Sequence, residues 1–444
     1  MKNALASSQE LPLPVPTPPA LPAASEGTNA GTVVNSSNAQ DFRALIIPEF
    51  YPLVRARLIE MDSVSSLRAD LKTYKQELEP SADEAALLPS GELREGFKLK
   101  YGMPFPAWES EEDSKRRAQK LIWNVQAKNW NQKLIFADFS ISYIEDSKFS
   151  KQLRGSWQRI YPGIMSPEDK TIQLFRELIQ FNSPSILKGL NYLTFRFLGS
   201  EEDMLWLSSP VTKKVRELTG SNRSDPFLDS SFSPDDFLGW SGKVELSEVK
   251  YDKELTALVP FSSFDAKTLS SSGSCDTYKK PPPASPNNHW NYSSHRFPDA
   301  FPWLPTEAVF VPRQIIRLEL VPKDPFSLYG RQILYIDKEL MIPYYKFVFN
   351  RAGYLWKTVF NVPALYHTKD NARTYVFTDY TLIEDRQKKT ANIFEFDNTN
   401  FCSAYTESIK LNNFEPQKLI PPAPPASDDK KAVGSKDVPV KKKP

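Results

Sequence analysis

The stretch Gln314-Ile315-Ile316-Arg317-Leu318-Glu319-Leu320-Val321 alternates apolar and polar side chains, the pattern of a β-strand with one buried face. Turn residues follow it from Pro322 to Gly330, and Asn350-Arg351-Ala352-Gly353 has the composition of a hairpin turn. Further strands are predicted at 332–337, 343–349, 355–359 and 374–382. Because no room remains between them for crossover helices, the pattern predicts an antiparallel meander and argues against a parallel doubly wound fold.

The first half of the chain combines strands with two predicted helices. A helix at about 111–130 follows Ser110-Glu111-Glu112-Asp113, which has the form of a capping box. A second helix at 166–181 follows Ser166-Pro167-Glu168-Asp169, with proline at the first helical position and acids in the first turn. Alternating segments predict strands at 134–144, 190–198, 204–207 and 213–218.

Three regions depart from the composition of a folded domain. Residues 1–40 are mostly Pro, Ala, Ser, Thr, Gly and Asn, and residues 415–444 are rich in Pro and Lys, so we expect a disordered arm and a disordered tail. Residues 261–305 predict a long loop insertion. The remaining range, 41–414, is expected to form a single β-dominated α+β domain.

Charge and cysteine content narrow the function classes. Lys plus Arg total 56 against 54 Asp plus Glu, and a net charge of +2 gives little attraction for nucleic acid. The two cysteines, Cys275 and Cys402, could form one disulfide in an oxidising compartment or stay unpaired. Three scattered histidines show no metal-ligand spacing, so we predict no metal and no other cofactor.

Membrane contact is expected to be peripheral rather than integral. No run of about 18 apolar residues predicts a transmembrane helix. The sequence Met1-Lys2-Asn3-Ala4-Leu5-Ala6-Ser7 has a basic start and an Ala-x-Ala ending but not the apolar stretch of a signal peptide, so none is evident in this chain.

No catalytic constellation stands out, and we expect the protein not to be an enzyme. The sequence contains no Gly-rich phosphate loop, Gly-x-Ser-x-Gly elbow, His-Glu-x-x-His or Cys-x-x-Cys motif. The paired acids Asp235-Asp236 and Glu201-Glu202-Asp203 could in principle serve in acid–base catalysis, and a hydrolase that uses Asp235 or Asp236 is one alternative hypothesis. Ser233-Pro234-Asp235-Asp236 also has the form of a turn or helix start, which favours a structural role.

A loop of defined shape is predicted between residues 213 and 237. Gly220 and Asn222 tolerate positive φ, and Pro226 keeps the chain from rejoining a central strand. Guanidinium–carboxylate pairs could fix this loop without a ligand, and direct ligand contact is the alternative. The residues of this structural loop motif are Arg216, Ser221, Asn222, Arg223, Asp225, Asp235 and Asp236.

Aromatic residues are frequent on the predicted strands. Such residues usually fill a core, but a curved sheet that closes only partly around helices can leave a concave apolar surface for an acyl chain or another hydrophobe. The candidate ligand-binding residues on that face are Trp157, Tyr192, Phe195, Trp206, Tyr335, Tyr345, Phe347 and Trp356.

Several motifs, in order, resemble a family of exported Gram-negative proteins described as outer-membrane lipoprotein-sorting-like, and the resemblance covers roughly residues 45–385. In the first half the motifs are Gly155-Ser156-Trp157, Arg216 to Phe227, Phe232 to Phe237, Gly239 and Ser241-Gly242-Lys243. In the second half they are Lys323-Asp324-Pro325, Leu334 to Lys338, Pro343 to Lys346 and Gly353 to Lys357.

The resemblance implies an open, curved antiparallel β half-barrel with helices packed in its concave mouth, similar to the LolA/LolB lipoprotein carriers. It also implies placement in the periplasm or at the outer-membrane periphery, with a resistance-nodulation-division-type transporter or another envelope protein as partner. The leading hypothesis is therefore a non-enzymatic carrier or envelope-assembly factor that binds a lipid or other hydrophobic small molecule. The alternative is a structural or interaction subunit of an envelope complex with a filled core and no ligand.

Overall fold

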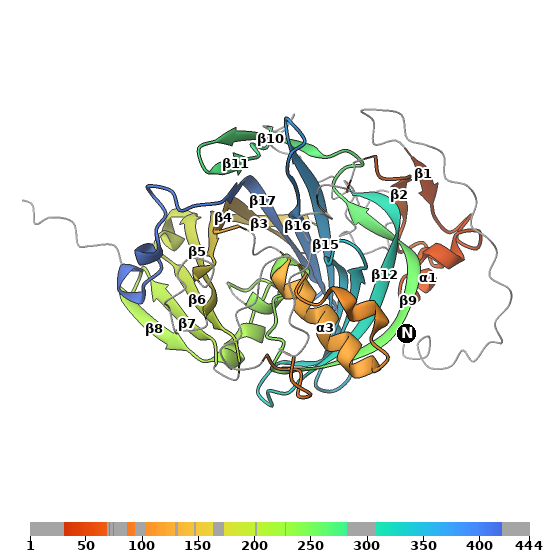
Figure 1. The fold of residues 1–444 in the computed structure, drawn as a ribbon, viewed down its shortest axis with the longest axis horizontal. Coiled ribbons are helices and arrows are strands. Elements are labelled where there is room, and N and C mark those ends of the chain that lie inside the picture. Colours follow the sequence, from red (N-terminus) through yellow and green to blue (C-terminus); the bar gives the residue numbers. More distant parts are fainter. Residues whose placement is uncertain are drawn as a thin grey trace, which may run out of the picture.

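The fold is one large, strongly curved β-sheet with a helix inside the curve (Figure 1). The computed structural model describes residues 31–68, 71, 74, 87–93, 103–128, 132–145, 148–162, 173–199, 202–226, 228–281 and 308–419. The β-dominated α+β fold expected from the sequence is confirmed. The strands are β1 (Thr32–Val34), β2 (Met61–Val64), β3 (Leu134–Glu145), β4 (Lys148–Ile160), β5 (Gln173–Ser183), β6 (Asn191–Phe197), β7 (Met204–Ser209), β8 (Lys214–Leu218), β9 (Ser247–Phe261), β10 (Lys267–Ser272), β11 (Cys275–Thr277), β12 (Val309–Pro322), β13 (Tyr329–Asp337), β14 (Pro343–Asn350), β15 (Leu355–Thr368), β16 (Thr374–Asp385) and β17 (Thr390–Cys402).

All helices but one in the described residues are short. The described α-helices are α1 (Tyr51–Arg55) and α3 (Ser114–Ala127). Single turns of 3-10 helix occur at η1 (Arg43–Leu45), η3 (Pro106–Ser110), η5 (Ser185–Leu187), η6 (Gly220–Ser224), η7 (Pro234–Gly239), η8 (Leu411–Asn413) and η9 (Pro416–Lys418). Within the described part of the chain, no helix has the length and apolar character needed to span a membrane.

The main sheet is an antiparallel series whose two halves meet at β17. The pairings run β9-β12-β13-β14-β15-β16-β17, and β17 then pairs with β3, which begins the series β3-β4-β5-β6-β7-β8. The meander predicted between residues 314 and 382 is confirmed, including the turn in which the amide of Gly353 donates to the carbonyl of Asn350. The sheet therefore has β9 at one side and β8 at the other, and residues 219–226 and 228–246 connect these two strands. We call these residues the crossing segment.

Helix α3 confirms the predicted helix at 111–130 but begins later than the capping box suggested. Its N-cap is Asp113, whose side chain accepts hydrogen bonds from the amides of Lys115 and Arg116. Ser110 instead ends the 3-10 turn η3 and donates its hydroxyl to the carbonyl of Ala107. The apolar face of α3 is buried against the concave side of the sheet (Figure 1).

The second predicted helix, at 166–181, is wrong over its described part. Residues 173–183 form β5, which pairs with β4 and β6, and residues 166–172 lie outside the described range. Phe175 and Ile179 are buried in one core cluster, whereas Leu178 is buried in another. A strand buried on both faces places apolar residues at spacings that also fit a helix, so periodicity alone could not separate the two.

Both chain ends of the described region pack on the outer side of the sheet. Phe50, which follows η1, stacks on Phe360 with ring centroids 5.2 Å apart, over the β12–β15 half. Phe414 and Leu419 cover the β3–β6 half. Residues 31–40 and 415–419, which the sequence placed in the arm and the tail, thus include β1 and η9; the rest of the arm and tail lies outside the described residues.

Part of the expected insertion is regular structure. Within residues 261–281 the hairpin β10–β11 joins the main sheet, with β10 parallel to β15 and β11 antiparallel to β17. Cys275 and Cys402 face each other in the β11–β17 pair and form a disulfide, which settles the pairing that the sequence left open. Residues 282–307, the remainder of the insertion, lie outside the described range.

Candidate functional site: the cover of the concave face

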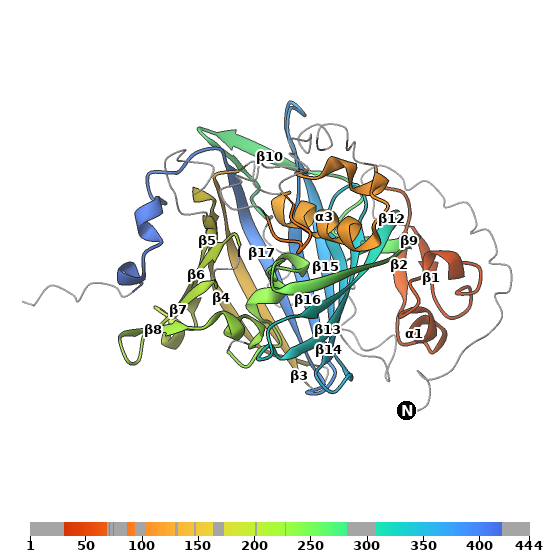
Figure 2. The ribbon, with the colours of Figure 1, turned by 60° about the horizontal axis from the view of Figure 1, so that its bottom comes forward.

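The crossing segment lies over the concave face of the sheet beside α3 (Figures 1 and 2). Two capping boxes shape it: Asn222 accepts from the amide of Thr219, and Asp236 accepts from the amide of Ser233 at 3.0 Å. Gly239 has φ +84°, and a Cβ there would approach the side chains of Asn361 and Pro343 to about 3.0–3.1 Å. Only glycine combines this backbone conformation with so close an approach to the sheet.

Apolar side chains of the crossing segment complete the core. Phe232 and Phe237 pack on Phe394 of β17 at ring-centroid distances of 5.2 and 5.0 Å. Trp240 and Val244 belong to the same buried cluster, which α3 also joins. Within the described part of the chain, the concave face is therefore covered by one helix and one largely irregular segment.

A fully buried ionic cluster holds the middle of the crossing segment to the sheet. The carboxylate of Asp236 accepts from Nζ of Lys346 at 2.5 Å and contacts Nζ of Lys357 at 3.4 Å, and all three side chains are 0% exposed. The hydroxyl of Tyr329 donates to the same carboxylate at 2.8 Å. Lys357 also donates to the hydroxyl of Ser233 at 2.9 Å. Because every oxygen of Asp236 already has donors, its geometry is that of a structural anchor.

Electrostatics agree with this assignment. Burial would raise the pKa of Asp236, but the ammonium groups of Lys346 and Lys357 outweigh burial and lower it below its usual value. Burial lowers the pKa of Lys357, and Asp236 opposes that shift. Asp236 is the carboxylate that faces both lysines. Its removal would leave their positive charges buried without this partner, which is costly in free energy.

A second cluster holds the ends of the crossing segment. Asp203 accepts from Nε of Arg196 at 2.6 Å and lies 3.2 Å from Nε of Arg223, which also donates to Asp235 at 2.8 Å. Arg196 and Arg223 both donate to the backbone carbonyl of Ser241, at 2.9 and 2.8 Å. Burial raises the pKa of Asp235, and the guanidinium of Arg223 opposes that shift. The two arginines thus fix the backbone at Ser241.

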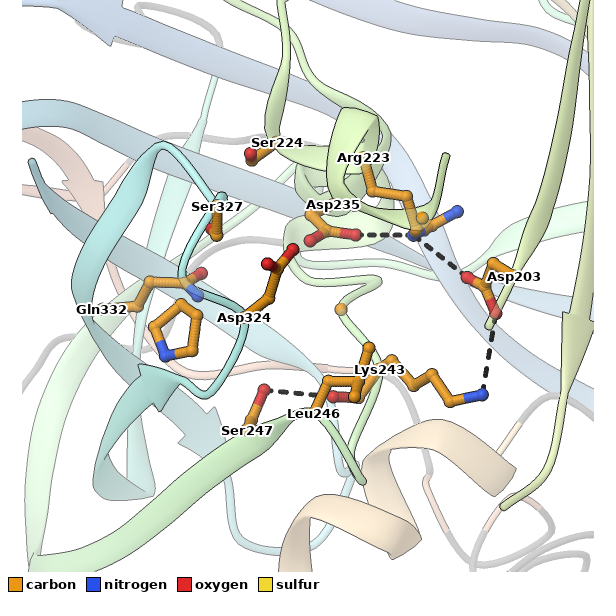
Figure 3. A pocket seen from close by; sticks show the side chains of 13 residues that line it. Asp203, Arg223, Ser224, Asp235, Lys243, Leu246, Ser247, Asp324, Ser327 and Gln332 are labelled. Carbon is orange, nitrogen blue, oxygen red and sulfur yellow. Dashed lines mark hydrogen bonds and ion pairs between the residues drawn. The ribbon is translucent and has the colours of Figure 1, made fainter. Parts of the chain in front are cut away.

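A small polar pocket opens beside this second cluster. Asp203, Arg223, Asp235 and Lys243 line one side of it, and Asp324 lies on the turn opposite (Figure 3). Its volume is about 50 Å³, compared with about 300–1,000 Å³ for typical small-molecule sites. The pocket has room for water-sized polar molecules but not for an acyl chain.

The eight aromatic candidates do not share one face. Trp157 and Tyr192 belong to the core on the concave side. Tyr345 points to the other side, because its neighbour Lys346 reaches Asp236 and successive strand residues alternate between faces. Tyr335 and Phe347 lie with Tyr345 under the N-terminal residues, and Phe195 and Trp206 lie under the C-terminal residues. Trp356 packs with Tyr329 near the start of β15.

The residues of the predicted loop motif lie closer together than the aromatic candidates do. Arg223, Asp235 and Asp236 lie in the two ionic clusters, and Asn222 donates to Asp225 at 2.6 Å within η6. Arg216 is exposed on β8 and lies outside both ionic clusters. Ser221 lies in η6, and its side chain is outside the described set.

Sequence reasoning missed most of the partners on the sheet. Lys346 stands between large aromatic residues in Tyr344-Tyr345-Lys346-Phe347, and Lys357 directly follows Leu355-Trp356. A lysine at a core position of a central strand must find a buried acid, so this pattern signals an ion pair without naming the partner. Arg196 and Lys243 carried no comparable signal.

The arrangement supplies charge pairing rather than metal ligation. Among the residues that the structure describes, no group of three or more His, Cys, Asp or Glu side chains is placed to hold a metal ion. Asp235 has a carboxylate near the pocket, but no serine–histidine or cysteine–histidine pair accompanies it there. The chemistry available is therefore hydrogen bonding and ionic anchoring of the cover.

Comparison with solved structures gives similar chains at low sequence identity. A domain from Vibrio parahaemolyticus, described as a candidate outer membrane lipoprotein-sorting protein, is 16% identical with a TM-score of 0.46, over 68% of this chain and 97% of its own. A DUF1329 family protein from Desulfovibrio piger is 14% identical with a TM-score of 0.47, over 69% and 99%. A LolA superfamily protein from Nitrosomonas europaea is 12% identical with a TM-score of 0.38, over 66% and 96%.

Sequence comparison identifies the family. No curated protein is similar enough in sequence to count as a match. A family model described as protein of unknown function (DUF1329) matches residues 33–419. That range includes the motifs on which the family resemblance was based, and the resemblance is confirmed. Since the match spans most of the 444 residues, the chain belongs to the DUF1329 family.

Proposed function

We propose that the protein is a non-enzymatic carrier or assembly factor that binds an apolar ligand, such as a lipid acyl chain, against the concave face of its sheet. The observation that carries this proposal is the nature of the cover. Phe232 and Phe237 pack on the aromatic side chains of the sheet, and ion pairs hold the segment that carries them in position. Moving this segment aside exposes a continuous apolar surface that a ligand can cover in its place.

The energetics permit such an exchange. A C16-type chain contributes on the order of 10 kcal/mol gross, at about 0.8 kcal/mol per buried methylene. The ligand must offset its own ordering and the apolar contacts that the cover gives up. The ligand re-covers the sheet but not the displaced aromatic side chains, so the net cost of displacement combines their lost burial with the broken ion pairs.

Placement in the cell envelope is part of the proposal. The disulfide between Cys275 and Cys402 supports an oxidising compartment, because such bonds persist in the periplasm and are rare in the cytosol. We therefore place the protein in the periplasm or at the outer-membrane periphery of a Gram-negative cell. A transporter of the resistance-nodulation-division type or another envelope protein would be its partner.

A filled structural subunit is the second candidate. Trp157, Phe237 and Phe394 are at most 1% exposed, and the pocket beside Arg223 and Asp235 is small and polar. This closed state suits a protein that only docks onto an envelope complex. The two candidates differ in whether the cover opens.

Ligand binding distinguishes them. Fluorescent fatty acid is titrated into detergent-free, delipidated protein, and the protein as purified is analysed by native mass spectrometry. The carrier should bind the probe, and Arg223→Gln, which loosens the cover, should accelerate binding several-fold. Arg216→Gln, an exposed change close by, is the control and should leave the rate unaltered. A homogeneous apoprotein that binds no probe, in the wild type and in Arg223→Gln, would exclude the carrier and favour the filled subunit.

A further inference from the structure

Exposed apolar side chains concentrate at one end of the sheet. We call four turns at this end, β5–β6, β7–β8, β12–β13 and β14–β15, the turn rim; the β3–β4 and β16–β17 turns lie at the same end between its two flanks. The β5–β6 and β7–β8 turns expose Ile186 (72%) and Val211 (81%). On the opposite flank, the β12–β13 and β14–β15 turns expose Phe326 (78%) and Tyr354 (69%). A few exposed apolar residues are ordinary on any surface, but four on turns at the same end call for an explanation.

Antiparallel pairing places all four turns at this end. Neighbouring strands reverse direction, so the end of β5 lies with the start of β4, the end of β3 and the start of β17. The same alternation continues through β16, β15, β14 and β13 to the end of β12. In Figure 2 the turn rim lies along the lower side of the molecule, where β8, β13 and β14 are labelled.

Within each flank the two turns are neighbours. A Cβ at Gly189 of the β5–β6 turn would lie 3.7 Å from Pro210 of the β7–β8 turn. On the other flank Arg351 donates through Nε to the carbonyl of Ser327 at 2.9 Å and through Nη2 to that of Asp324. Each flank is thus one defined tip rather than two independent loops.

The charge on these tips is basic. Residues 184–190 and 209–214 contain no acid, and residues 322–328 contain a single half-buried acid, Asp324, which caps the amide of Phe326. The exposed bases of the four turns are Lys188, Lys213, Lys214, Lys323 and Arg351. Projecting apolar side chains surrounded by lysine and arginine complement an anionic surface with an apolar interior.

We propose that the turn rim is a docking surface for an anionic lipid membrane, with the two tips inserting Ile186 and Val211 on one flank and Phe326 and Tyr354 on the other. A membrane fits better than an acidic protein, because a stable protein interface needs about 800 Å² of contiguous, packed surface on each partner. Single side chains at separated turns do not provide such a surface, whereas each can enter a headgroup layer on its own. This inference concerns the outside of the sheet and does not depend on ligand binding inside it.

Vesicle flotation tests the proposal with the full chain. The protein should float with phosphatidylcholine vesicles containing 30% phosphatidylglycerol and not with pure phosphatidylcholine, and high salt should release it. Removal of one base, as in Lys213→Ala or Lys214→Ala, should weaken binding roughly fivefold. Ile186→Ser with Val211→Ser, and separately Phe326→Ser with Tyr354→Ser, should each reduce the floated fraction several-fold.

Met204→Ser provides the matched control. Met204 is 44% exposed but begins β7 at the opposite end of the sheet, so its replacement should not change flotation. Unchanged melting temperatures would show that the tip variants are folded. No flotation of the wild type, equal flotation on neutral vesicles, or full binding by folded tip variants would each overturn the proposal. Capture by an acidic protein without vesicle binding would also overturn it.

Discussion

Helix α3 and the crossing segment cover the same concave face by different means. Helix α3 contributes an apolar stripe that includes Leu121 and Ile122, both 0% exposed. The crossing segment adds aromatic contacts but is positioned by Asp236, Asp235 and their cationic partners. Apolar contacts are tolerant of small shifts, whereas a buried ion pair is stable in one geometry and costly in others. Apolar burial therefore holds the helix on the sheet, whereas ion pairs determine where the crossing segment lies.

The largest expected effect comes from breaking the buried ionic cluster. Asp236→Ala leaves Lys346 and Lys357 unpaired in the core and should lower the free energy of unfolding by about 3–5 kcal/mol, measured by urea denaturation. Glu217→Ala, an exposed change on β8, should alter stability by no more than about 0.5 kcal/mol. Replacing both lysines by Met in addition to Asp236→Ala should recover part of the loss. A loss below about 1 kcal/mol in Asp236→Ala would contradict the anchoring role.

Leu121→Ala tests the apolar cover. The side chain is fully buried, and its truncation should cost about 3 kcal/mol from lost burial and the cavity left behind. Unlike the Asp236 variant, this loss should be the same at low pH, where carboxylates are protonated. A loss of stability that depends strongly on pH would show that helix α3 and the crossing segment are energetically coupled.

Lys128, the C-cap of α3, is one charged group in the apolar cover. It donates to the carbonyl of Met341 at 2.8 Å, and burial lowers its pKa from 10.5 to about 7, with Asp337 opposing. Between pH 7 and 10.5 the unfolded chain keeps a proton that the folded chain has lost, so stability should rise with pH. From pH 7 to 9 the gain should be about 2 kcal/mol, at about 1.4 kcal/mol per unit.

The control for this pH dependence is Lys128→Met. The variant lacks the titrating group, so the difference between its free energy of unfolding and that of the wild type should change across the same pH range. Chemical denaturation at several pH values measures it. A difference that does not vary with pH would mean that Lys128 titrates normally in the folded protein.

The smallest effect is expected at the start of α3. Asp113→Ala removes the acceptor for two backbone amides and should cost about 1 kcal/mol. Glu112→Ala, an exposed neighbour that does not cap the helix, should cost less. Equal losses in the two variants would place the cap elsewhere.

The elements that were predicted correctly are those determined by residues close together in the sequence. The strands between residues 314 and 382 alternate in polarity and are separated by turn residues, so pattern alone located them. β5 failed because burial on both faces erased the alternation, and β4 was missed because its sequence, from Lys148 to Ile160, is largely polar. The alternation of apolar and polar residues within a strand does not determine which strands pair with each other.

The candidate site depends even more on contacts between residues that are far apart in the sequence. The sequence placed Arg223, Asp235 and Asp236 together in a structured loop, because they lie within 14 positions of one another. Lys346 and Lys357 are more than 100 positions from Asp236, so nothing local connected them to it. The aromatic candidates were chosen by residue type, which cannot distinguish the two faces of a sheet once both are covered.

The sheet cannot be completed until synthesis has passed β17. β17, which ends at Cys402, lies between β16 and β3 and is the strand that joins the two halves. A chain that has emerged only to residue 389 leaves β3 and β16 each with an unpaired edge, and such edges are prone to wrong pairing. Synthesis from the N-terminus thus produces two incomplete half-sheets first, and β17, the last of the described strands, then joins them into one sheet.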